Sequence, residues 1–172
     1  MQQSLAQLHP TIPILYAASP VVLDDAARVR GQRVLVIEDG PTITHGGMPW
    51  GAGHVAAIAA GAIPIDPRPY AAPLLQATYA QYPHIGAVLP ALGYSHEQLQ
   101  ALRATIEATP AEAIISATPI DLAALLALSK PVLRARYEFA ETEQPGLAGL
   151  IADFLQRHPS DGDRVHGKQT DR

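Results

Sequence analysis

The stretch that decides the fold of this 172-residue chain is Arg33-Val34-Leu35-Val36-Ile37-Glu38-Asp39-Gly40. Residues 34–37 form an apolar run without polar alternation, which is typical of a strand that helices cover on both faces. A second run of this kind occupies residues 113–117. We therefore expect an open, mostly parallel sheet flanked by helices, in a three-layer, Rossmann-like α/β fold.

Short β-rich runs alternate with amphipathic segments along the rest of the chain. We expect strands at residues 12–17, 33–37, 62–65, 87–89, 113–117 and 132–139, and helices at residues 51–60, 70–81, 95–108, 121–128 and 146–158. Ser95 predicts a helix cap. We expect the polar side chain that bonds back to it to stand one residue beyond the position of a strict capping box. Asp121 predicts a second cap. Most prolines fall at strand-to-helix junctions, where they separate the elements without interrupting them.

The bulk composition is that of one globular domain. Hydrophobic residues make up 48% and charged residues 16% of the sequence, and 172 residues suffice for one core but not for two ordinary domains. We predict a single α/β domain over residues 1–158. Residues 159–172 are polar and lack apolar periodicity, so we predict a disordered tail.

Several classes of function are excluded by composition. A net charge of −4 provides no general attraction for nucleic acid or for an anionic membrane. The absence of cysteine rules out disulfides, thiolate metal sites and a cysteine nucleophile, and the histidines show no metal-ligand spacing. No apolar stretch approaches the roughly 18 residues of a membrane span. We expect a cytoplasmic protein, and self-association into a homo-oligomer stays open.

The loop after residues 33–37 concentrates groups that bind anions. Gly46 and Gly47 would let the backbone approach a phosphate, Thr42 and Thr44 could donate hydroxyl hydrogen bonds, and His45 could donate a hydrogen bond or act as an acid or base. Ligands of open parallel sheets bind outside the carboxyl ends of the strands, where this loop falls. The alternative is an irregular loop that needs its glycines for positive φ and its threonines for capping.

Three further strand ends carry candidate ligand groups. Arg68, held between two prolines, suits phosphate or carboxylate recognition, or is a surface residue paired with Asp66. Thr118 could contact a ligand, while capping alone explains Asp121. Arg134 and Arg136 share one face of their strand, so that face is either an exposed edge or an anion site.

No phosphate-binding loop is recognisable in the chain. Residues 162–169 match Gly-x4-Gly-Lys, but Gln169 stands where such loops carry the Ser or Thr that binds magnesium. No strand precedes this stretch and no helix follows it. We therefore reject it as a nucleotide site.

Several uncommon strings together give the chain a resemblance to a known family: residues 34–48, 66–70, 82–86, 89–94, 117–122 and 134–138. From about Pro13 to Leu155, and in the same order, they resemble the C-terminal part of the cyclic 2,3-diphosphoglycerate synthetase-like proteins, also described as predicted P-loop GTPases. Members of that family carry a Rossmann-like domain and a P-loop region ahead of this part. The enzyme that gives the family its name uses ATP to close 2,3-diphosphoglycerate into an intramolecular phosphoanhydride.

The resemblance implies that this chain is the C-terminal domain of such a synthetase-like or GTPase-like enzyme. A phosphorylated small molecule would be its ligand, and Mg²⁺ with ATP or GTP would bind mainly outside the chain, on a missing or separately encoded P-loop domain. We expect His45, Glu38 and Asp39 to be catalytic. The expected substrate contacts are Gly40, Thr42, Thr44, Gly46, Gly47, Arg68, Thr118 and Arg136.

The alternative hypothesis is a stand-alone module that binds or senses a phosphometabolite without catalysis. The two hypotheses differ in what they predict for residues 12–20. An enzyme that docks its missing domain there should leave an exposed apolar surface, whereas a self-sufficient module should cover that segment.

Overall fold

A computed structural model describes residues 14–93 and 95–159 of the chain. The described residues form two compact units: an α/β unit, Val21–Glu138, and a terminal unit made of residues 14–20 and 139–159. The single domain expected over residues 1–158 stays a prediction, and the expected disordered tail lies outside the described residues except for Pro159. Within the described ranges, the structure has no helix that is both long enough and apolar enough to cross a membrane.

Six strands build the sheet of the α/β unit: β2 (Val21–Leu23), β3 (Arg33–Asp39), β4 (Ile63–Pro64), β5 (Leu89–Ala91), β6 (Ala113–Ala117) and β7 (Val132–Tyr137). The order is β2-β7-β6-β3-β4, and β5 pairs with the last residues of β3. The pair of β2 with β7 is antiparallel, and the other pairs of this sheet are parallel. The expected mostly parallel sheet is confirmed.

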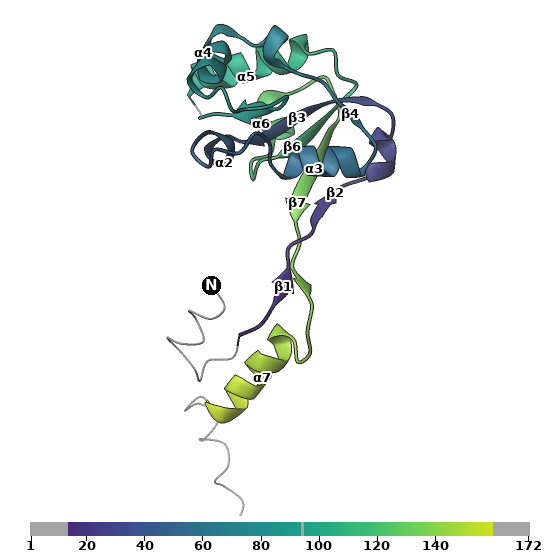
Figure 1. Ribbon diagram of the computed structural model, residues 1–172, viewed down its shortest axis with the longest axis vertical. Coiled ribbons are helices and arrows are strands. Elements are labelled where there is room, and N and C mark those ends of the chain that lie inside the picture. Colours follow the sequence, from purple (N-terminus) through teal and green to yellow (C-terminus); the bar gives the residue numbers. More distant parts are fainter. Residues whose placement is uncertain (1–13, 94, 160–172) are drawn as a thin grey trace, which may run out of the picture. The chain divides into compact units, whose positions relative to one another are not determined.

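Helices cover both faces of this sheet, which confirms the three-layer α/β fold. α3 (Ala52–Ala59) packs on one face, and α4 (Pro73–Gln81), α5 (His96–Ala108) and α6 (Leu122–Leu126) pack on the other (Figure 1). Val34 and Val36 point to the α3 side, and Leu35 and Ile37 point to the opposite side. All four side chains are fully buried, so the apolar run of β3 lacks alternation because neither face meets water.

Two helix caps expected from the sequence are present. Ser95 and Gln98 form a reciprocal capping box at the start of α5, so the polar partner stands at the strict position and not one residue beyond it. Asp121 Oδ1 accepts a hydrogen bond from the Ala124 N–H at 3.1 Å. At the far end of α5, the Lys130 Nζ donates to the carbonyl oxygens of Ile106 and Thr109 at 2.6 and 2.7 Å.

The prediction of a long loop after β3 is wrong for the first part of that stretch. Residues 40–44 form a short helix, α2 (Gly40–Thr44), and Asp39 is its N-cap. The Asp39 carboxylate accepts from the Thr42 N–H at 3.3 Å, and Pro41 occupies the first turn, where its missing N–H costs nothing. Single turns of 3₁₀ helix at Ala26–Val29 and Arg68–Tyr70 were also not expected.

The terminal unit is a two-stranded ribbon with one helix. β1 (Ala17–Ala18) pairs antiparallel with β8 (Ala140–Glu141), and α7 (Leu147–Arg157) follows. The Glu141 carboxylate accepts from the Leu147 N–H at 2.7 Å and thereby caps α7. Of the strand expected at residues 12–17, only Ala17 lies in β1 among the described residues, and residues 14–16 have no regular secondary structure.

The contact between α3 and the sheet depends on Gly53. A Cβ at this position would lie 2.9 Å from Val36 Cγ1 and 3.1 Å from Ala117 Cβ. We expect Gly53→Ala to lower the free energy of unfolding by about 1 to 3 kcal/mol, because these core side chains would have to move. Urea denaturation measures the effect.

Helix propensity alone predicts the opposite sign, since alanine exceeds glycine by about 1 kcal/mol within helices. A stabilised Gly53→Ala variant would therefore contradict the packing argument. The matched control is Ala59→Gly, at an exposed position of the same helix, which should lose about 1 kcal/mol by propensity.

Candidate ligand-binding site

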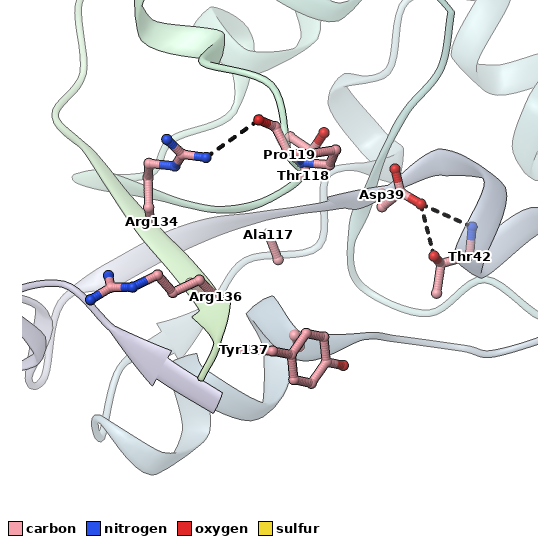
Figure 2. Close-up of a pocket in the computed structure, with 10 residues that line it drawn as sticks. Asp39, Thr42, Ala117, Thr118, Pro119, Arg134, Arg136 and Tyr137 are labelled. Atoms are coloured by element: carbon pink, nitrogen blue, oxygen red, sulfur yellow. Dashed lines mark hydrogen bonds between the residues drawn. The ribbon is translucent and has the colours of Figure 1, made fainter. Parts of the chain in front are cut away.

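A pocket of about 380 Å³ lies at the carboxyl ends of the strands in the α/β unit. Its lining comes from the end of β3, the start of α2, the start of α3, the end of β6 and the second half of β7 (Figure 2). The residues are Asp39, Thr42, Ala52, Ala117, Thr118, Pro119, Arg134, Ala135, Arg136 and Tyr137. The site lies where the sequence predicted one for a parallel sheet.

The topology explains why a pocket forms at this point. After β3 the chain passes to α3 on one face of the sheet, and after the neighbouring β6 it passes to α6 on the other face. The two connections therefore diverge and leave a crevice above the end of β6. Such a switch point is where ligands bind in open α/β sheets.

Arg134 is the pocket cation that no carboxylate neutralises among the described residues. Its side chain is exposed, and its Nη2 donates a long hydrogen bond of 3.4 Å to the Pro119 carbonyl oxygen (Figure 2). Arg136, from the same strand, pairs with Asp24 and with Glu138, the latter at 3.1 Å. Because β7 lies between β6 and β2, the face bearing these arginines is not a free sheet edge.

The pocket also contains an acid and two hydroxyls. Asp39 is half-buried, and its Oδ2 accepts from the Thr42 hydroxyl at 2.8 Å (Figure 2). Thr118 is buried, and its Oγ1 accepts from the Ile120 N–H at 3.4 Å. The site thus combines an unpaired guanidinium with a carboxylate and hydroxyl groups, and it can bind a ligand with both an anionic and a hydrogen-bond-donating end.

Glu38 lies next to this pocket but caps a helix. Its buried carboxylate accepts the backbone N–H groups of Gly51, Gly53 and His54 at 3.0, 3.2 and 2.8 Å. A Cβ at Gly51 would lie 2.7 Å from Glu38 Oε2. The glycines that begin α3 therefore let the backbone approach an anion, as their type suggested, but that anion is a side chain of the protein.

The environment of Glu38 disfavours its charge. Burial raises the pKa of Glu38 above its ordinary value of 4.5, although the three backbone hydrogen bonds act in the opposite direction; the neighbouring Asp39 raises it further. Burial also lowers the pKa of His54, whose ring stacks on Trp50 with 5.1 Å between centroids.

The other expected loop residues do not line the pocket. His45 ends α2 with its Nδ1 2.9 Å from Thr44 Oγ1, and the Thr44 hydroxyl donates to the Gly40 carbonyl oxygen at 2.8 Å. Gly46 and Gly47 follow in an exposed turn. The short helix α2 separates this group from Asp39, so His45 and Asp39 stand at opposite ends of one element.

Arg68 also lies outside the pocket. It forms an ion pair with Asp66, which was the alternative to ligand binding that the sequence left open. Its Nη2 lies 2.6 Å from Asp66 Oδ2, and its Nε donates to the same carboxylate. These hydrogen bonds lower the pKa of Asp66.

Of the residues expected from the sequence, the pocket brings together Asp39, Thr42, Thr118 and Arg136. Glu38, Gly40, Thr44, His45, Gly46, Gly47 and Arg68 lie elsewhere in the α/β unit, and the catalytic and binding roles expected of all these residues stay predictions. The main residue not selected from the sequence is Arg134. Its period-two spacing from Arg136 was the available signal, but spacing does not show which arginine has a carboxylate partner.

Comparison with known proteins relates the chain to a synthetase. It is 43% identical over 157 residues to the protein named arginine synthetase ArcE from Thermococcus kodakarensis. The match covers 91% of this chain but 35% of the relative, so the chain spans about a third of the length of the curated relative it matches. No family model matches the chain, and no solved structure matches it.

The Glu38 cap should contribute strongly to stability. Glu38→Ala removes the acceptor of three backbone N–H groups at the start of α3. We expect the free energy of unfolding to fall by roughly 3 kcal/mol or more, because each unpaired buried donor costs at least about 1 kcal/mol. Glu97→Ala, at an exposed position in the first turn of α5, is the matched control, and an equal loss in both variants would contradict the role assigned to Glu38.

The raised pKa of Glu38 also predicts a pH dependence. A carboxyl whose folded-state pKa exceeds its unfolded value stabilises the fold fully below the unfolded value, here 4.5, and this contribution is lost as the pH rises through the folded-state pKa. Glu38→Gln should flatten that part of the profile of unfolding free energy against pH. An unchanged slope in the variant would show that other groups produce it.

Proposed function

We propose that this chain is the substrate-binding part of a nucleotide-dependent synthetase, and that the pocket at the ends of β3, β6 and β7 holds the substrate. The observation that carries the proposal is the unpaired Arg134 in a pocket at the switch point of the sheet. The similarity of 91% of the chain to part of a protein named arginine synthetase supports the reaction class.

The charges of the pocket favour an amino-acid substrate. Arg134 has no carboxylate partner among the residues that the structure describes, so its guanidinium can bind an anionic group, and the Asp39 carboxylate in the same pocket can accept from an ammonium or guanidinium group. A polyanion such as 2,3-diphosphoglycerate would need several unpaired cations, because like charges in one site repel strongly. A ligand with one carboxylate and one cationic end is balanced by these groups, as arginine or its direct precursor would be.

Within such an enzyme the described residues bind and orient the substrate. Arg134 would hold a carboxylate through charge-assisted hydrogen bonds, and Asp39 would fix the opposite polar end, with its own rotamer held by Thr42. Fixing both ends of a substrate contributes to catalysis through orientation.

The described residues show no site that fits a magnesium-bound nucleotide. No group of three histidine, aspartate or glutamate side chains in the described ranges is placed to hold a metal ion. The N–H groups at the start of α3 are occupied by Glu38. We therefore assign ATP or GTP and its magnesium to a polypeptide segment beyond this chain.

The second candidate is the phosphoanhydride-forming activity that the family resemblance implies, with 2,3-diphosphoglycerate as the substrate. Thr42 and Thr118 favour it, since both bring hydroxyl groups to the pocket that Arg134 and Arg136 also line, as a phosphate site would. The two candidates differ in the ligand that the isolated chain should bind.

The test is the thermal midpoint of the chain with L-arginine, with 2,3-diphosphoglycerate, and with ATP or GTP plus magnesium. A ligand at about 100 times its Kd adds roughly 2.7 kcal/mol to the free energy of unfolding. We expect stabilisation by L-arginine that Arg134→Gln removes. Arg103→Gln, an exposed position on α5, is the charge-matched control and should keep it.

Each outcome decides between the candidates. Stabilisation by 2,3-diphosphoglycerate alone, lost in Arg134→Gln, would replace the amino-acid substrate with the bisphosphate. Stabilisation by a nucleotide alone would show that the nucleotide binds within this chain. Stabilisation by none of these ligands, or stabilisation that Arg134→Gln retains, would overturn the assignment of the pocket.

A further inference from the structure

The terminal unit buries no hydrophobic side chain in the described residues. The buried hydrophobic residues of the structure all lie between Val29 and Ala135, inside the α/β unit. Seven of the fifteen large hydrophobic side chains that are exposed belong to the terminal unit, which contributes only residues 14–20 and 139–159: Ile14, Tyr16, Phe139, Leu147, Ile151, Phe154 and Leu155. The unit thus presents apolar surface without forming a core.

The apolar residues of α7 lie on one side of the helix. Leu147, Leu150, Ile151, Phe154 and Leu155 follow the spacing i, i+3, i+4, i+7, i+8, which places them along one stripe. Four of them are 44% to 60% exposed: Leu147, Ile151, Phe154 and Leu155. An isolated helix of 11 residues is marginal in water, and helices of this length owe their stability to the burial of such a stripe.

The segment that precedes the ribbon is exposed as well. Ile14 and Tyr16 are each 38% exposed, and the two residues of β1 are exposed. The expectation that a docked domain would leave apolar surface at residues 12–20 stays a prediction, since residues 12 and 13 lie outside the described residues. These exposed apolar side chains add to the apolar surface that α7 presents in the same unit.

The comparison with the synthetase indicates what the partner is. The chain matches 35% of the relative, so a polypeptide about twice as long as this chain is needed to complete a synthetase of that kind. The proposed function requires such a polypeptide, because the nucleotide does not fit the residues described. A protein surface that complements α7 must itself be apolar, and the unmatched part of such a synthetase is the occupant that the comparison supplies.

We propose that α7 and the exposed segment 14–18 form the docking surface for the nucleotide-binding part of the synthetase, the part of the relative that this chain does not match. This inference rests on the proposed function, and it names the partner that the synthetase would need. The α7 stripe supplies the apolar centre of the interface, and Asp153 and Arg157 supply its polar rim.

The experiment co-expresses this chain with the unmatched part of the Thermococcus kodakarensis protein and determines the mass of the purified species by native mass spectrometry. We expect a one-to-one complex with the wild-type chain. Ile151→Asp should weaken the association by at least about 30-fold, as for a residue at the centre of an interface. Ala152→Asp adds the same charge to the same helix, one residue away and outside the stripe, and should leave the complex intact.

Three results would overturn the proposal. The first is the absence of a complex with the wild-type chain, including a failure of that chain to keep the partner in solution. The second is a dimer of this chain alone that Ile151→Asp dissociates, which would make a second copy the occupant. The third is a lower thermal midpoint of the isolated chain in Ile151→Asp but not in Ala152→Asp, which would show that the chain covers the stripe itself.

These readouts do not depend on the substrate. Association is measured without L-arginine or nucleotide, so a failure of the pocket to bind its ligand would leave the docking result interpretable. A complex that forms although Arg134→Gln changes no ligand effect would support the docking surface while overturning the pocket assignment.

Discussion

The buried carboxylate of Glu38 is the constraint on which the rest of the α/β unit depends. It joins the end of β3 to the first turn of α3 through three backbone N–H groups, which would otherwise be unpaired donors. The contact is close enough that a Cβ at position 51 would lie 2.7 Å from Glu38 Oε2, and a Cβ at position 53 would press on Val36 and Ala117 beneath the helix. It holds the chain on one face of the sheet after β3, while the chain after β6 passes to the other face, and the pocket is the crevice between those two connections.

In this arrangement the N–H groups at the start of α3 bind a carboxylate of the protein, and a side chain of β7 is left to bind a ligand anion. The start of α3, which in many α/β proteins receives a ligand phosphate, is already neutralised by Glu38. An anionic ligand must therefore be held by side chains, and Arg134 is the pocket arginine without a carboxylate partner among the described residues. One free cation beside one carboxylate favours a ligand of low net charge over a polyanion, which agrees better with a relative named for arginine than with a bisphosphate substrate.

Much of the fold could be predicted from residue patterns, because burial dictates them. The apolar runs of β3 and β6 and the caps at Ser95 and Asp121 are local signals with one physical meaning each. The pairings that the sequence did not predict are those whose partners are distant in sequence. The antiparallel pairs of β2 with β7 and of β1 with β8 join residues more than 110 positions apart, and α2 depends on how Asp39 turns at the end of its strand. The ion pair of Arg68 with Asp66, two residues away, is the alternative that the sequence left open.

The sequence by itself determined the class of fold and the edge of the sheet at which the pocket lies, because strand periodicity and the position of loops follow from hydrophobicity and local backbone preferences. Only the tertiary structure decided which polar residues at that edge are committed to the protein and which are free. Glu38 binds backbone N–H groups of α3, and Arg136 pairs with Asp24 and Glu138. Arg134 has no carboxylate partner among the described residues and is the candidate for a ligand. The physical reason is that a charged side chain is neutralised by whatever the fold brings within a few ångströms, and sequence spacing does not contain that distance.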